Sequence, residues 1–139
     1  MKISVKNLQK KLPIKPGKIK ELVLNILKCE KKGGSGYINI CFTDDALIKK
    51  FNAKFRQNDS STDVLAFDLN DTGKGKILLA DIMISTDTAV NNAAKFNTNP
   101  EYELMLYVTH GILHILGYGD SDKARKNQMR KKELEYVNR

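Results

Sequence analysis

The segment from Pro100 to Leu116 constrains the fold most, because apolar residues surround it on almost every side. Asn99 can cap a helix here, and Pro100 occupies its first position. The expected helix has about 17 residues and is roughly 25 Å long at 1.5 Å per residue. Its apolar residues are Leu104, Met105, Leu106, Val108, Ile112, Leu113, Ile115 and Leu116. We therefore expect this helix to be buried on most of its faces.

The same helix carries His110 and His114, the only 2 histidines of the chain. A spacing of four places both rings on one helix face, where one divalent metal can bind them. Gly117 can end the helix in a left-handed conformation, so that Asp120 can turn back and supply a third ligand. Two imidazoles and one carboxylate suit zinc and leave a fourth position for water. Asp122 is the alternative third ligand, and Asp120 can instead cap the following helix.

Three protein ligands and one water favour metal-assisted hydrolysis. In helical zinc proteases a glutamate follows the first histidine and acts as general base, whereas this chain has Gly111. Glycine cannot transfer a proton, which argues against peptide hydrolysis by that mechanism. A metallopeptidase or another metal-dependent hydrolase on the same site is the alternative. A non-catalytic module with a structural metal is a third hypothesis.

Two further polar residues are candidates for the site. Arg56 lies in a polar loop and can bind phosphate oxygens, or it can form a surface ion pair with Asp59 or Asp63. Asp81 lies in an otherwise apolar strand, so a buried carboxylate there needs a partner. That partner can be the second nitrogen of a metal-binding histidine or a backbone group.

Period and turn signals predict one α+β domain over residues 1–139. Strands are expected at 2–6, 37–42, 64–69 and 77–84. The last two should pair as an antiparallel hairpin, and 77–84 should be central because it is nearly all apolar. Besides the histidine helix, helices are expected at 18–32, about 44–55, 88–96 and 121–137. The last helix is basic, with Met129, Leu134 and Val137 as its thin apolar side.

The net charge of +8 is concentrated in residues 1–32 and 121–139, whereas residues 33–120 carry an excess of acids. Basic ends around a metal site suggest a surface that binds a polyanion, although lysine-rich faces are often only solvated. No apolar run approaches the roughly 20 residues that span a bilayer, and the first residues lack the apolar core of a signal peptide. Cys29 and Cys41 are expected to be reduced thiols of a cytoplasmic protein.

Three stretches resemble the YbeY-type endoribonuclease family of bacterial rRNA maturation factors. They are the histidine motif His110–Tyr118, the segment Phe51–Phe67 and the strand Leu79–Ser85. The resemblance implies a small mixed four-stranded sheet packed with about five helices, one of them a zincin-like metal helix. It also implies a zinc-dependent, single-strand-specific endoribonuclease acting in 16S rRNA 3′-end maturation and ribosome quality control. The implied partners are single-stranded RNA and the ribosome or ribosomal proteins.

The resemblance implies that Arg56 matches the family's essential arginine, which would clamp the scissile phosphate beside a metal-activated water or a metal-polarised phosphate. One departure concerns the metal. The family usually has Asp-His after the tyrosine, whereas this chain has Gly119 and Asp120. A carboxylate ligand adds negative charge and makes the metal a weaker Lewis acid. We therefore expect one Zn²⁺ on His110, His114 and Asp120, with another divalent ion possible.

Overall fold

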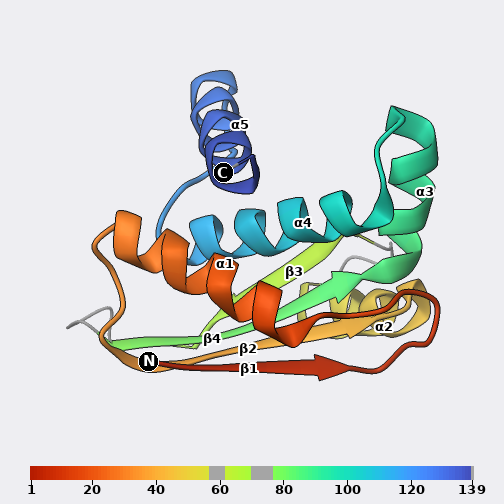
Figure 1. Ribbon diagram of the computed structural model, residues 1–139, viewed down its shortest axis with the longest axis horizontal. Helices are drawn as coiled ribbons and strands as arrows, with labels where there is room; N and C mark the ends of the chain where they lie inside the picture. The colour runs from red at the N-terminus through yellow and green to blue at the C-terminus, as the bar shows by residue number, and fades with distance from the viewer. Residues whose placement is uncertain (57–61, 70–76, 139) are drawn as a thin grey trace.

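The computed structural model describes residues 1–56, 62–69 and 77–138. Within these ranges the chain forms a four-stranded sheet and five helices (Figure 1). The strands are β1 (Lys2–Asn7), β2 (Ser35–Thr43), β3 (Val64–Asp68) and β4 (Ile77–Ser85). The helices are α1 (Pro16–Cys29), α2 (Asp45–Arg56), α3 (Thr86–Phe96), α4 (Pro100–Ile115) and α5 (Lys123–Val137). The predicted α+β class with four strands and about five helices is confirmed.

The sheet is mixed, with the strand order β1-β2-β4-β3. The pairs β1–β2 and β2–β4 are parallel, whereas β3 and β4 are antiparallel, with Phe67 opposite Asp81. The predicted hairpin pairing and the central place of β4 are therefore confirmed. A central strand has neighbours on both sides, and the apolar run of β4 follows from burial in that position.

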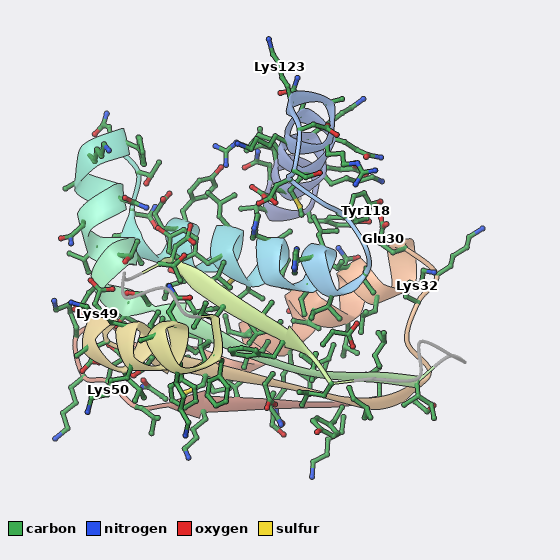
Figure 2. All side chains as sticks on the ribbon, turned by 180° about the vertical axis from the view of Figure 1, so that it is seen from behind. Glu30, Lys32, Lys49, Lys50, Tyr118 and Lys123 are labelled. Atoms are coloured by element: carbon green, nitrogen blue, oxygen red, sulfur yellow. The ribbon has the colours of Figure 1, made fainter. Side chains whose placement is uncertain are left out.

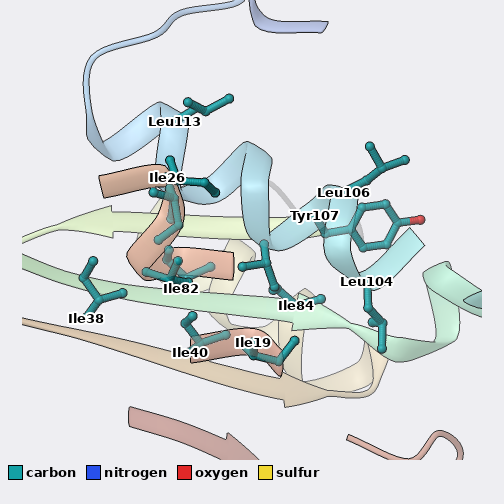
Figure 3. Packing of buried hydrophobic residues seen from close by; sticks show 14 of the residues in the cluster. Ile19, Ile26, Ile38, Ile40, Ile82, Ile84, Leu104, Leu106, Tyr107 and Leu113 are labelled. Carbon is teal, nitrogen blue, oxygen red and sulfur yellow. The ribbon is translucent and has the colours of Figure 1, made fainter. Parts of the chain in front are cut away.

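The main core lies between the sheet and the helices α1 and α4 (Figure 1). Isoleucines at alternate positions of β2 and β4 point toward these helices, as period-two geometry requires (Figure 3). These isoleucines are Ile38, Ile40, Ile82 and Ile84, and each is at most 1% exposed. From the helices, α1 contributes Ile19, Val23, Ile26 and Leu27, and α4 contributes Leu104, Leu106, Tyr107, Val108, Ile112 and Leu113. The prediction that the histidine helix is buried on most faces is confirmed.

Gly111 lets α4 approach the sheet closely. A Cβ built at this residue would lie 3.0 Å from Cγ2 of Ile82 and 3.3 Å from Cγ2 of Val64. Both neighbours are β-branched and stiff, so they can move little. The glycine that separates this chain from helical zinc proteases therefore has a packing role, and any side chain at this position would press against Ile82 and Val64.

The opposite face of the sheet is covered in part by α2. A second, smaller apolar cluster forms there from Ile48, Leu65 and Met83. Because Ile82 faces α4, the preceding residue on β4, Asp81, faces the other way, toward the α2 side. Of the described helices, none combines the length and the apolar character that crossing a membrane requires.

The cap predicted for α4 is confirmed, and α3 is capped in the same way. Ser85 accepts a hydrogen bond from the backbone N–H of Thr88 at 2.9 Å, and Asn99 accepts one from Tyr102 at 2.8 Å. The sequence predicted that α1 would extend to residue 32, but the helix ends at Cys29. Lys31 takes a left-handed conformation, with φ of 55°, and closes the helix after Cys29, although no glycine marks this position.

The predicted apolar side of α5 was partly wrong. Its buried residues are Met129, Glu133 and Tyr136, whereas Leu134 and Val137 are only partly buried. The buried side follows the helical spacing of four and three residues, but one of its members is a carboxylate. A hydrophobic pattern cannot find such a residue, because its burial depends on a partner elsewhere in the chain.

Candidate functional site

The end of α4 has the geometry that the sequence predicted. Gly117 has a φ of 105°, and its N–H donates to the carbonyl of His114 at 3.0 Å. The next N–H, of Tyr118, donates to the carbonyl of Leu113 at 3.0 Å. These two bonds form a Schellman motif, which ends the helix and turns the chain back. The predicted left-handed end of α4 at Gly117 is therefore confirmed, whereas the approach of Asp120 to the histidine pair stays a prediction.

His110 is held by a carboxylate from α5. Its Nδ1 lies 2.7 Å from Oε2 of Glu133, whose side chain is only 8% exposed. The hydrogen bond with Glu133 raises the pKa of His110 above its ordinary value, although burial acts in the opposite direction. The negative charges of Asp63 and Asp120 raise this pKa further. Glu133 therefore fixes the ring through Nδ1 and leaves Nε2 as the nitrogen that can bind a cation.

Glu133 was not predicted from the sequence, which offered Asp81 as a possible partner of a metal-binding histidine or of a backbone group; both alternatives for Asp81 were wrong. Asp81 accepts a hydrogen bond from Nδ2 of Asn39 at 2.9 Å, on the sheet face away from α4. Its partner is thus neither a histidine nor a backbone group. The one available signal for Glu133 was its place four residues after Met129 on a helix with few apolar residues.

The two candidate third ligands differ in their surroundings. Asp122 caps α5, because its Oδ1 accepts a hydrogen bond from the N–H of Arg125 at 2.8 Å. The capping role that the sequence analysis considered for Asp120 thus belongs to Asp122. Asp120 and His114 are both exposed, whereas His110 is half-buried. Among the described residues, no three or more His, Cys, Asp and Glu side chains gather closely enough to hold a metal ion.

The turn after α4 is tied to two other helices through Glu30, the residue that follows α1. Its carboxylate accepts hydrogen bonds from the hydroxyls of Tyr118, at 2.6 Å, and Tyr136, and Nζ of Lys132 lies 3.4 Å away (Figure 2). Burial alone would raise the pKa of Glu30, but these donors outweigh it and hold the pKa below its ordinary value. The same contact raises the pKa of Tyr118 to about 12. This junction fixes the segment that leads to Asp120.

A cleft of about 480 Å³ lies beside His110. Its floor is α4, and its walls come from α3 and α5. Helix α5 stands on the side of α4 away from the sheet, whereas α3 rises from the end of β4 beside the start of α4 (Figure 1). The lining residues are Asp63, Asn92, Phe96, Thr98, Tyr102, Glu103, Leu106, Tyr107, His110, Arg130 and Glu133. The candidate histidine therefore opens onto a space large enough for part of a polymeric substrate.

Arg56 is the last residue of α2. Its side chain lies outside the part of the chain that the structure describes, as does Asp59. The phosphate clamp and the ion pair with Asp59 or Asp63 therefore both stay predictions. Asp63, just before β3, is described and lines the cleft beside His110.

The family model described as Endoribonuclease YbeY matches residues 4–139 of this chain. The chain belongs to the Endoribonuclease YbeY family. Its relatives include the Endoribonuclease YbeY of Pelotomaculum thermopropionicum, 31% identical over 100% of this chain and 97% of that protein. The Endoribonuclease YbeY of Aquifex aeolicus is 36% identical over 91% of this chain and 83% of that protein. The family resemblance found in the three sequence motifs is thus confirmed, and with it the prediction that the chain is an endoribonuclease.

The fold agrees with this assignment to the Endoribonuclease YbeY family. The solution structure of TM1509 from Thermotoga maritima superposes with a TM-score of 0.63 at 29% identity. The superposition covers 98% of this chain and 87% of TM1509. The likeness therefore extends over the whole sheet and all the helices described above.

Proposed function

We propose that this protein is a metal-dependent, single-strand-specific endoribonuclease that acts on cytoplasmic rRNA, in 16S 3′-end maturation and ribosome quality control. The observation that carries the proposal is the family match over residues 4–139, which includes the histidine motif and Glu133. The basic ends of the chain support a polyanionic substrate. Lys32 and Lys123, one from each end, point into solvent where RNA can reach them (Figure 2).

We assign the metal to His110, His114 and Asp120. The donor set of two imidazoles and one carboxylate suits zinc, and a carboxylate also admits other divalent ions. Glu133 binds Nδ1 of His110 and so leaves Nε2 for the metal. A carboxylate hydrogen-bonded to the second ring nitrogen is the usual neighbour of a metal-binding histidine. The exposed side chains of His114 and Asp120 can turn toward a cation without disturbing the core.

A metal bound there would supply a polarised water or a polarised phosphate oxygen at neutral pH. The residues of the chain would do the remaining work. Arg56 would bind the scissile phosphate bidentately and offset the charge that develops on it. Glu133 would hold the ring of His110 in one orientation and tautomer. Gly111 packs closely on the sheet and has no side chain that could act as the general base of a helical zinc protease, which speaks against the peptidase alternative.

The proposal is tested with a fluorescently labelled single-stranded RNA and the same strand in a duplex. The wild type should cleave the single strand and lose activity in a chelator. His114→Ala should abolish cleavage and reduce bound metal, measured by elemental analysis of the purified protein. Asp122→Asn is the matched control, because Asp122 caps α5 and is not assigned to the metal.

Cleavage that survives His114→Ala would contradict the assigned metal site. A protein that hydrolyses peptides but leaves RNA intact would favour the peptidase alternative. A metal that binds tightly without any hydrolysis would favour a structural metal in a non-catalytic module.

A further inference from the structure

Two exposed side chains that line the cleft beside His110, Phe96 and Arg130, have no role in the proposed mechanism. Phe96, at the end of α3, is 58% exposed although its ring lines the cleft. Arg130 lines it from α5, and its side chain is also 58% exposed. We propose that Phe96 and Arg130 form a nucleotide-binding subsite, in which a base stacks on the ring and the guanidinium binds a backbone phosphate. The inference rests on the proposed function, since it assigns the substrate contacts of the same site.

The inner part of the cleft is already satisfied by its own hydrogen bonds. The hydroxyl of Thr98 donates to Oε2 of Glu103 at 2.9 Å, and Nδ2 of Asn92 donates to the hydroxyl of Tyr107 at 2.9 Å. These contacts make a fixed wall whose donors and acceptors are engaged with one another.

The outer part of the cleft is different, because the side chains of Phe96 and Arg130 remain exposed there and can contact a ligand. Arg130 has five N–H donors, and its Nη1 donates to Oε1 of Glu133 at the long distance of 3.4 Å. Lys95 places its Nζ 5.3 Å from the ring centre of Phe96. This ammonium group lies over one face of the ring, so a base would stack on the other face. An exposed aromatic ring and a guanidinium that line the same cleft can together bind a nucleotide, since the base offers a π-face and the backbone offers negative charge.

The geometry also favours an unpaired strand. Stacking on Phe96 needs the free face of a base, which a duplex presents only at its ends. The floor of the cleft runs along α4 from Tyr102 to His110, roughly 12 Å at 1.5 Å per residue. A strand lying along this floor would have one nucleotide on the Phe96 subsite while its backbone continues to His110. The subsite would thus position the scissile bond and select for single strands.

The test measures binding of a short 2′-O-methylated single-stranded RNA that contains one 2-aminopurine and is not cleaved. Phe96→Ala should weaken binding by about 5- to 140-fold, the range for loss of one base–aromatic stack. It should also abolish the quenching of 2-aminopurine that stacking produces, whereas Phe96→Tyr should keep both. Phe55→Ala is the matched control, because Phe55 is 55% exposed and is not among the residues that line the cleft.

Arg130 is tested by the dependence of binding on salt. Arg130→Gln should reduce the slope of log K against log salt by about 0.7, the value for one phosphate contact with a single strand. A residue that only supports Glu133 would leave this slope unchanged. The proposal is overturned if Phe96→Ala and Phe55→Ala bind alike, or if the salt slope of Arg130→Gln equals that of the wild type.

The subsite and the proposed function fail in different ways. If the wild type cleaves RNA while Phe96→Ala keeps its KM and its affinity, the subsite is wrong and the endoribonuclease stands. If the wild type binds the strand through Phe96 but cleaves no RNA, the subsite stands and the proposed function is wrong. The subsite would also be contradicted if Phe96→Ala lowered kcat but left RNA binding unchanged.

Discussion

Glu30→Gln should destabilise the protein, because Glu30 joins α1 to the turn after α4 and to α5. Its side chain is 12% exposed and accepts from Tyr118, Tyr136 and Lys132. A hydrogen bond to a charged group contributes about 1.5–3 kcal/mol. Glutamine keeps one acceptor oxygen but loses the charge, so about one such bond is lost. We expect the free energy of unfolding to fall by about 2 kcal/mol, measured by urea denaturation at neutral pH.

Glu101→Gln is the matched control for this measurement. Glu101 pairs with Lys18 at 3.4 Å and Lys15 at 3.9 Å, but its side chain is 52% exposed. An ion pair in water contributes only about 0–1 kcal/mol. If both variants lose the same small amount, Glu30 is not a structural junction and the reasoning is refuted.

The stability difference between wild type and Glu30→Gln should depend on pH in a defined way. The pKa of Glu30 is lowered by folding, so its contribution is present above the ordinary value of 4.5 and is lost as the pH falls through the lowered pKa. The pKa of Tyr118 is raised from 10.0 to about 12, so its contribution is present below pH 10 and is lost as the pH rises toward 12. The difference should therefore shrink at both extremes. A difference that grows in acid would contradict this assignment.

Three further variants test the packing and the site. Gly111→Ala should lower the free energy of unfolding by about 1 kcal/mol, measured by thermal unfolding. Overpacking against Ile82 costs about 1–3 kcal/mol, which exceeds the gain in helix propensity from alanine. A variant more stable than the wild type would contradict this. Glu133→Gln should weaken zinc binding about 10- to 100-fold, measured by competition with a chelator, because His110 loses the carboxylate that orients its ring. An unchanged zinc affinity would show that Glu133 does not orient His110 for the metal. Arg56→Ala should slow single-turnover RNA cleavage about 100-fold or more at unchanged melting temperature, and full activity would remove the phosphate clamp.

The local elements could be predicted because their signals are local. Side-chain oxygens at Ser85 and Asn99 cap the helices that follow them, and Gly117 takes the left-handed conformation that ends α4. Such contacts join residues within a few positions of each other, so the sequence itself contains both partners. The end of α1 was missed because Lys31 adopts a conformation that usually requires glycine or asparagine.

The site was predictable only where it lies on one helix turn. Helix geometry places His110 and His114 on one face, because they are four residues apart. The family motif in the sequence also contains both residues. Glu133 was missed because it lies 23 residues from His110, and its burial depends on how α5 packs on α4. Asp81 was misassigned because the strand pattern does not say what lies on each face of the sheet.

The sequence alone determined the identity of the elements, the pairing of β3 with β4, the buried helix and the family. Each of these depends on period, on caps or on motifs of neighbouring residues. The tertiary structure alone decided that Glu133 holds His110, that Glu30 gathers donors from residues 88 to 106 positions away, and that Phe96 and Arg130 face one cleft. These contacts join elements whose relative placement comes from core packing, and no local pattern encodes which side chains that packing brings together.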